Sequence, residues 1–155
     1  MVEIRIAKRE DSQLVLDFIK EIAKYEKLSN EVIGSKELLE KWMFDKKLIE
    51  VAFIMENNKE VGYALYFYNF STFLTKPGLY LEDIFIKEKY RNKGYGKKLF
   101  EYLINKAKTE YLGRMEWVCL DWNEPSIKFY ESLGAKAMEG WTIFRLDEAT
   151  LNKIK

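Results

Sequence analysis

Residues 79–99 contain the pattern that most constrains how this chain can fold. Leu79 to Ile86 is an apolar, β-rich run typical of a strand, and a Gly-containing basic turn follows it and opens a helical pattern. Between Lys87 and Lys98 there are six cations and one acid, so this window carries +5 in a chain whose net charge is +1. Several of these cations lie where a helix dipole is already positive, which is unfavourable unless an anion binds. The segment therefore predicts a strand, a phosphate-binding turn and a helix.

The glycines of this turn suit phosphate binding. Gly94 and Gly96 lack a Cβ and allow the backbone N–H groups to approach a polyphosphate closely. Two common phosphate motifs are excluded, because the glycine spacing differs from the dinucleotide fingerprint and Arg91 stands where a P-loop needs glycine. A solvated basic loop is the alternative interpretation of the same residues, and the turn alone leaves both open.

The N-terminal half predicts a strand, two helices and a hairpin. Val2 to Ile6 alternates as in a strand, and apolar residues repeat at helical spacing from about Asp11 onward. Ser35 is a residue type that caps a helix N-terminus, so a second helix is expected after it. The β-rich runs 49–55 and 61–68 flank Asn57-Asn58-Lys59 and predict an antiparallel hairpin.

The C-terminal half predicts further strands and helices that complete a layered fold. They comprise a loop over 70–78, a helix with an apolar face from Leu99 to Tyr111 that stops at Gly113, a strand over 116–122, a helix over 125–133 ended by Gly134, and a strand over 141–146. Hairpin and helical connections together indicate an α/β (α+β) class with a mixed, mostly antiparallel central sheet flanked by helices. No linker splits the chain, so we expect one domain over 1–155.

Composition narrows the functional classes. A near-neutral chain of 155 residues with one local basic cluster does not suit a general nucleic-acid binder. One cysteine cannot form an internal disulfide, and no signal peptide or apolar run of spanning length is visible, so a cytoplasmic protein without membrane attachment is expected. The chain has no histidine, and any acid–base chemistry must therefore use carboxylate, Tyr, Lys, Cys or water.

Several motifs together resemble one enzyme family. Arg91-Asn-Lys-Gly-Tyr-Gly96 fits the (Gln/Arg)-x-x-Gly-x-(Gly/Ala) signature of the GNAT N-acetyltransferases, whose turn binds the pyrophosphate of acetyl-CoA. The remaining matches run in order along nearly the whole chain and are similar to the diamine branch, the spermidine/spermine and thialysine acetyltransferases: Ala23-Lys-Tyr-Glu26, Tyr80-Leu-Glu-Asp83, Tyr90-Arg91, Trp122-Asn-Glu-Pro-Ser-Ile127, Phe129-Tyr130, Gly134-Ala135 and Glu139-Gly-Trp141.

The resemblance implies a donor site for acetyl-CoA and no metal. Its strands at 79–86 and 116–122 would diverge and admit the pantetheine arm. The residues implied in cofactor binding are Ile84, Phe85, Ile86, Arg91, Asn92, Lys93, Gly94, Tyr95, Gly96, Lys97, Asn123, Ser126 and Tyr130. Asn92, Lys93 and Lys97 depart from the usual turn residues of the family, but backbone groups carry phosphate binding, which should survive.

The resemblance also implies two catalytic groups and an acceptor site. Tyr130 resembles the general acid that protonates the leaving CoA sulfur, since a phenol with a reference pKa near 10 is protonated at neutral pH. Glu82 resembles the group that accepts the amine's proton, and simple alternation would point Glu82 and Asp83 to opposite faces of the strand. The residues implied near the acceptor are Tyr25, Glu26, Glu82, Asp83, Glu116, Trp117, Val118 and Trp141.

The expected activity is acetyl transfer to a small amine, polyamine or lysine-like, by direct attack in a ternary complex. Homodimerisation is implied by resemblance alone. Cys119 allows a covalent acyl-enzyme, although an isolated Cys in an apolar strand is usually inert. The stretch from Gly134 to Trp141 is shorter than in polyamine-acetylating relatives, which bears on the acceptor. The alternatives are acetylation of a protein amine, a non-catalytic acyl-CoA sensor, and RNA binding through the basic patch, which the charge balance disfavours.

Overall fold

The computed structural model describes residues 1–155, which separate into two compact units, Met1–Val118 and Cys119–Lys155. The first unit holds a five-stranded sheet made of β1 (Val2–Ile6), β2 (Glu50–Glu56), β3 (Lys59–Ser71), β4 (Lys76–Ile86) and β5 (Met115–Glu116), in that spatial order. The first three pairings are antiparallel and the pairing of β4 with β5 is parallel. The predicted α/β class with a mixed, mostly antiparallel sheet is confirmed, while the single domain over 1–155 stays a prediction.

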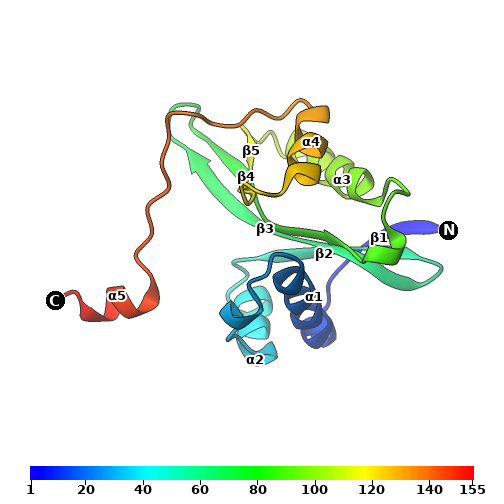
Figure 1. Ribbon diagram of the computed structural model, residues 1–155, viewed down its shortest axis with the longest axis horizontal. Coiled ribbons are helices and arrows are strands. Elements are labelled where there is room, and N and C mark those ends of the chain that lie inside the picture. Colours follow the sequence, from blue (N-terminus) through cyan, green and yellow to red (C-terminus); the bar gives the residue numbers. More distant parts are fainter. The chain divides into compact units, whose positions relative to one another are not determined.

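Helices cover both faces of this sheet (Figure 1). In the first unit, α1 (Ser12–Tyr25) and α2 (Lys36–Glu40) lie on one face and α3 (Tyr95–Thr109) on the other. A π-helical segment, η3 (Lys41–Asp45), continues α2, and short 3-10 segments precede α1, α2 and α3 as η1 (Arg9–Asp11), η2 (Ser29–Glu31) and η4 (Glu88–Tyr90). The second unit contains α4 (Glu124–Ser132) and α5 (Glu148–Lys153). No helix combines the length and apolar character needed to cross a bilayer.

The core explains why the predicted strands and helices form. Phe18 on α1 packs its ring 5.9 Å from Phe53 and 5.0 Å from Tyr63, both of which are fully buried on the sheet. Leu99 and Leu103, at helical spacing on α3, are also completely buried. Because β2 is buried almost throughout, it has the continuous apolar run of a central strand.

Several predicted boundaries are confirmed by turn and cap geometry. The hairpin between β2 and β3 turns through Asn57 and Asn58, which have φ of 49° and 65°, as a tight hairpin turn requires. The Ser35 side chain caps α2 by accepting a hydrogen bond from the Leu38 N–H at 3.2 Å. Pro125 lies in the first turn of α4, and Gly134 follows the helix with φ of 91°.

Four predicted features are wrong. The loop over 70–78 is mostly strand, because β3 and β4 pair as far as Ser71 and Lys76. The third helix ends at Thr109, so Gly113 does not stop it, and Tyr111 is 80% exposed instead of facing the sheet. The fifth strand has two residues, and residues 117–122 are not strand. Residues 141–146 are not strand either, since a strand needs a partner and their unit contains none.

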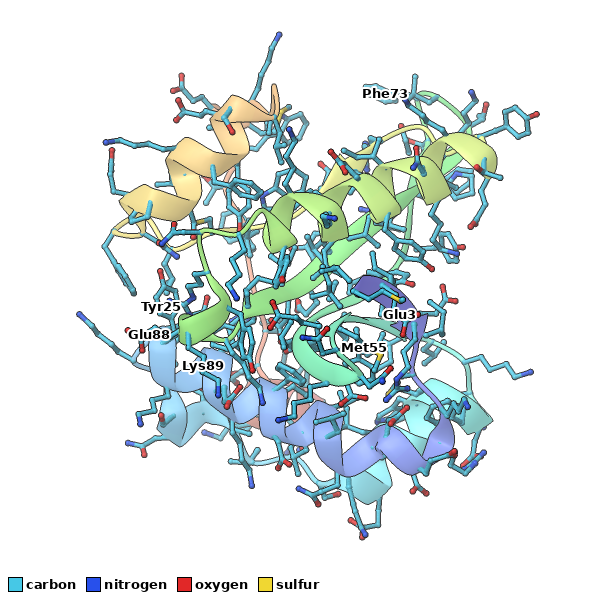
Figure 2. All side chains as sticks on the ribbon, turned by 90° about the vertical axis from the view of Figure 1, so that its right-hand side faces the viewer. Glu3, Tyr25, Met55, Phe73, Glu88 and Lys89 are labelled. Atoms are coloured by element: carbon cyan, nitrogen blue, oxygen red, sulfur yellow. The ribbon has the colours of Figure 1, made fainter.

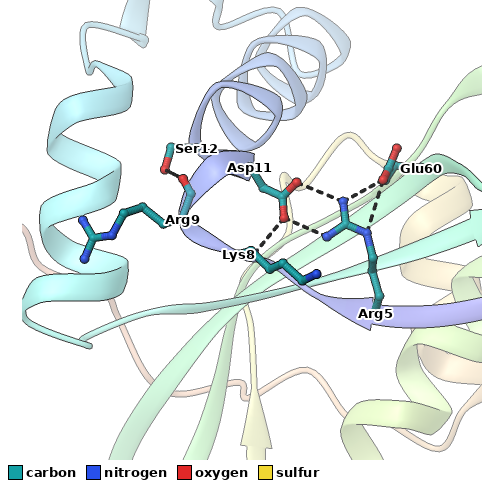
Figure 3. Close-up of polar contacts among 6 residues, drawn as sticks. All are labelled: Arg5, Lys8, Arg9, Asp11, Ser12 and Glu60. Atoms are coloured by element: carbon teal, nitrogen blue, oxygen red, sulfur yellow. Dashed lines mark hydrogen bonds and ion pairs between the residues drawn. The ribbon is translucent and has the colours of Figure 1, made fainter.

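An ion-paired network fastens the start of α1 to the sheet (Figure 3). Arg5 on β1 donates to both carboxylate oxygens of Asp11 at 2.7 and 2.9 Å and to Glu60 on β3 at 2.6 Å. Asp11 also accepts the Lys8 backbone N–H at 2.7 Å. The hydrogen bond from Arg5 lowers the pKa of Asp11 in the folded protein. The ionised carboxylate therefore stabilises the fold at any pH above the pKa that Asp11 has in the unfolded chain.

We expect Asp11→Asn to destabilise the fold by about 2 kcal/mol at neutral pH, because it removes a charge-assisted hydrogen bond from a mostly buried pair. Since the folded-state pKa is lowered, this stability is lost as the pH falls through it, and the two proteins should converge in acid. Urea denaturation of both proteins across pH measures the difference. A gap that stays constant into acid would contradict a role for the ionised carboxylate.

Candidate active site

The basic turn before α3 has the backbone that its sequence predicts. Asn92 and Gly94 both adopt left-handed conformations, with φ of 62° and 80°, and α3 begins immediately afterwards at Tyr95. Asparagine and glycine are the residues that tolerate this region best. The first N–H groups of this 15-residue helix have no partner within the helix and are available to a ligand at the turn.

Arg91 connects the turn to β4 and to α1. Its Nε donates to the Ile86 carbonyl at 2.8 Å, and its guanidinium lies 5.0 Å from the Tyr25 ring centroid and 5.1 Å from that of Phe85. Figure 2 labels Tyr25, at the end of α1, and Glu88 and Lys89 of η4, the segment that precedes Arg91. The arginine of the signature thus ties the turn to β4 and to α1.

Glu56 fastens the other side of the turn. This last residue of β2 accepts a hydrogen bond from the Tyr95 hydroxyl and pairs with Lys93 Nζ at 3.1 Å. The hydrogen bonds from Tyr95 and Lys93 lower the pKa of Glu56. Sequence reasoning missed Glu56, because nothing in the β2 pattern indicates that its last residue lies beside a turn some 40 positions later.

The N-terminus of α3 has open space in front of it that a phosphate could occupy. No side chain caps the N-terminus of α3, and nothing lies within 4 Å of the position that a Cβ on Gly94 would occupy. The groups that would hold the phosphates are the backbone N–H groups of Tyr95, Gly96 and Lys97, while the exposed Lys97 and Lys98 side chains add positive charge. The strand edge of β4 from Leu81 to Ile86 has no partner in β5, which pairs only with Leu79 and Tyr80. Main-chain groups of Ile84 and Ile86 are therefore candidates for pantetheine binding.

We expect Gly94→Ala to weaken acetyl-CoA binding by about tenfold or more, because the added methyl group occupies the approach to the backbone N–H groups and removes a charge-assisted hydrogen bond. Gly140→Ala is a matched control, since Gly140 also has a positive φ and open space around it. Both variants carry the same backbone strain, so only the first should lose affinity in calorimetric titration with acetyl-CoA. Equal losses would show that strain, and not phosphate contact, is responsible.

A β-bulge displaces Glu82 from the regular ladder. Leu65 on β3 pairs with Asp83, and the next residue, Tyr66, pairs with Leu81, so Glu82 is the extra residue on β4. Bulges re-aim side chains and are common beside active sites. The bulge interrupts the regular alternation on which the expectation of opposite faces for Glu82 and Asp83 rests, and that expectation stays a prediction. Glu82 is exposed.

Three carboxylates lie close enough to interact near this bulge. Burial raises the pKa of Glu26, and repulsion from Asp83 and Glu82 raises it further. Burial also raises the pKa of Asp83, partly offset by the Tyr63 hydroxyl, which donates to its Oδ2 at 2.5 Å. The pKa values of Glu26 and Asp83 are higher in the folded protein than in the unfolded chain. The two groups therefore reduce the stability of the fold once the pH exceeds their unfolded-state pKa values, and have no such effect at lower pH. A cation bound here would relieve that cost.

A cavity of about 480 Å³ adjoins two of these carboxylates. It lies among α1, the segment 28–35, α2 with η3, and β4, and its polar lining comprises Glu26, Glu31, Ser35 and Asp83. The other lining side chains are apolar. Sequence reasoning found Glu26 and Asp83 but missed the apolar walls, because Leu38 and Trp42 have the helical spacing of ordinary core residues.

Of the predicted acceptor residues at 116–118, Glu116 ends β5 and the other two follow it. Glu116 forms an ion pair with Arg114 Nε at 2.9 Å and accepts a hydrogen bond from Asn69 Nδ2 at 3.1 Å. Trp117 packs edge-on against Phe100 with ring centroids 5.2 Å apart, and Val118 is 54% exposed. None of these contacts joins Glu116 to Glu26. A role for Glu116 in binding the acceptor stays a prediction.

The remaining predicted residues belong to the second unit. Asn123 is buried and caps α4 by accepting the Ser126 N–H at 3.4 Å. Tyr130 lies on α4 with its ring 5.8 Å from that of Phe129. Trp141 is 78% exposed. Cys119 is half-buried and outside any strand, so the expectation of a strand cysteine is wrong.

Comparisons with known proteins agree with this geometry. The family model described as the acetyltransferase (GNAT) family matches residues 16–135. The thialysine N-epsilon-acetyltransferase of Sus scrofa is 33% identical over 99% of this chain and 96% of its own length. The L-ornithine N5-acetyltransferase of Arabidopsis thaliana is 43% identical over 60% of this chain and 41% of its own length, so the chain matches less than half of that relative.

Solved structures share the fold. An integron cassette protein from the mobile metagenome of V. cholerae superposes with a TM-score of 0.81 at 25% identity, covering 98% of this chain and 96% of that chain. The shared fold extends over almost the full length of both chains.

Proposed function

The chain belongs to the acetyltransferase (GNAT) family and is an N-acetyltransferase, and from this premise we propose that it acetylates the primary amine of a small cationic acceptor. Polyamines and lysine-like amines are the candidates that the resemblance supplies. The observation that carries the proposal is the group of interacting carboxylates, Glu26, Glu82 and Asp83, at the β4 bulge. Such a group attracts an ammonium and repels anions. The names of the thialysine and ornithine relatives support a small amine.

In the proposed mechanism, acetyl-CoA supplies the thioester carbonyl that the amine attacks directly. The carboxylates at the bulge bind the ammonium and orient it, and Glu82 accepts its proton, through water, so that the free amine forms. Tyr130 donates its phenolic proton to the departing sulfur. The turn from Asn92 to Lys97 binds the phosphates of acetyl-CoA and so sets how far the thioester reaches toward the amine. Asn123 and Ser126 are proposed to contact the donor, and Tyr25, Glu116, Trp117, Val118 and Trp141 the acceptor.

The test is CoA release from acetyl-CoA across a panel of spermidine, putrescine, thialysine, lysine, a simple alkylamine and a lysine peptide. We expect turnover with at least one small amine. Turnover confined to the peptide would favour the alternative, a protein amine acetyltransferase. Binding of acetyl-CoA without turnover of any amine would contradict the proposal and favour an acyl-CoA sensor.

We further propose that the chain works in a reducing cytoplasm, which suits its single cysteine, and that it is a homodimer. The support is the segment 141–146, whose apolar side chains Ile143 and Phe144 are 72% and 91% exposed and which has strand character but no strand partner in its unit. Phe144→Asp should shift the mass from dimer to monomer in sedimentation, while Phe73→Asp, at a fully exposed phenylalanine of the first unit, should not. A wild-type monomer at all concentrations would contradict the dimer.

A further inference from the structure

The cavity beside Glu26 has a charged end and an apolar end. Along α1 its lining runs from Glu26 back to Leu16, ten residues apart, or roughly 15 Å at helical rise. Glu26 and Asp83 interact electrostatically and so lie together. Glu31 lies in η2, which a short linker joins to this end of α1.

The opposite end of the cavity is defined by where η3 lies. Arg9, just before α1, pairs with Asp45 at 2.8 Å and with Glu40 at 3.9 Å. These contacts place the end of α2 and η3 beside the start of α1, and Trp42, between Glu40 and Asp45, is therefore at the Leu16 end. No carboxylate of the lining belongs to α2 or η3.

The lining selects a single kind of ligand. It contains no lysine or arginine, so the carboxylates that interact at its charged end have no cationic partner in the cavity wall. The apolar residues Leu28, Ile33 and Leu38 line the cavity and are 43%, 86% and 48% exposed, so that a ligand would cover apolar surface that is now in water. A ligand that fills the cavity would therefore bring positive charge to one end and apolar surface to the other.

We propose that the acceptor is a primary amine with one cationic head and an apolar body, such as an alkylamine or arylalkylamine, and that polyamines are poor acceptors. This inference rests on the proposed function, because the head group at Glu26 and Asp83 would lie beside Glu82. A second or third ammonium, as in spermidine, would lie at the Trp42 end, where the lining offers no carboxylate and the Lys41 ammonium already lies 4.7 Å from the Trp42 ring centroid. It would form no ion pair there and would be repelled by Lys41. Discrimination of this kind is about tenfold or more in apolar pockets.

Two measurements test the inference separately from the activity. The first is calorimetric titration of the full chain, with and without CoA, with hexylamine, spermidine and 1-hexanol. We expect hexylamine to bind about tenfold more tightly than either of the others, because spermidine lacks the apolar body and hexanol lacks the charge. The second is kcat/KM for hexylamine and spermidine with acetyl-CoA, where the same ratio is expected.

Variants then test each end of the cavity. Trp42→Glu places a carboxylate at the apolar end, and Trp42 is already 39% exposed, so the fold should tolerate it. It should lower the hexylamine-to-spermidine ratio by about tenfold. Leu48→Glu is the matched control, since Leu48 is 60% exposed, follows the same helix and does not line the cavity. Glu26→Gln should weaken hexylamine and leave hexanol unchanged.

The outcomes separate the two proposals. Tighter binding and faster turnover of spermidine than of hexylamine would overturn the apolar acceptor and leave the acetyltransferase proposal standing. Preferred hexylamine binding without CoA release from any amine would support the cavity's selectivity and overturn the proposed activity. Equal binding of all three ligands, or a ratio that Trp42→Glu does not change, would overturn the inference.

Discussion

Tyr130→Phe is expected to lower kcat by about a hundredfold or more, because it removes the proton that the departing sulfur needs while it keeps the ring. The KM for acetyl-CoA should stay nearly unchanged, since an interaction used only in the transition state affects kcat. Steady-state CoA release measures both constants. Tyr111→Phe, at an 80% exposed tyrosine, is the control and should retain full activity.

A small effect of Tyr130→Phe would assign the proton to another donor. If kcat stayed within about threefold of the wild type while acetyl-CoA binding was retained, general acid catalysis by Tyr130 would be contradicted. A parallel loss of affinity and kcat would instead indicate that Tyr130 positions the donor.

Glu82→Gln is expected to lower kcat/KM for the amine by about a hundredfold at neutral pH, because the amine then depends on bulk water for deprotonation. An alkylammonium holds its proton to about pH 10, so the free amine becomes more abundant as the pH rises. The defect should therefore shrink steadily toward high pH. The pH–rate profile of kcat/KM, with subsaturating amine and saturating acetyl-CoA, measures this recovery.

The control for Glu82→Gln is Glu101→Gln, an exposed glutamate of α3. It should leave the profile unchanged. A Glu82→Gln defect that is equally large at every pH would mean that Glu82 binds or orients the ammonium and does not accept its proton. In that case the base would have to be another carboxylate at the bulge.

The sequence predicts the regular parts of the fold well because their signals are local. The β1 strand, the Asn57-Asn58 turn and the Ser35 cap are each signalled by residues a few positions apart, and each is confirmed. The failures depend on distant partners. The segments 117–122 and 141–146 have strand composition, but a strand forms only where another strand is available to pair with it.

The sequence predicts the backbone of the candidate site better than it predicts the side chains that surround the site. Gly94 and the start of α3 follow from the turn signature, since glycine at a left-handed position is a local requirement. The Glu82 bulge, the Glu56 contact and the Tyr63 hydroxyl on Asp83 follow from register between strands, which a single sequence does not encode visibly. The apolar cavity depends on how α2 packs against α1.

The most direct test of the central claim is mass spectrometry of both amine and protein after mixing the chain with acetyl-CoA and a small primary amine. Direct transfer predicts an N-acetylated amine, formed at the rate of CoA release, and an unmodified protein in every quenched sample. Cys119→Ala should change neither. Acetyl-CoA that binds without yielding acetylated amine, or an acetyl group carried on Cys119 before it reaches the amine, would contradict the claim.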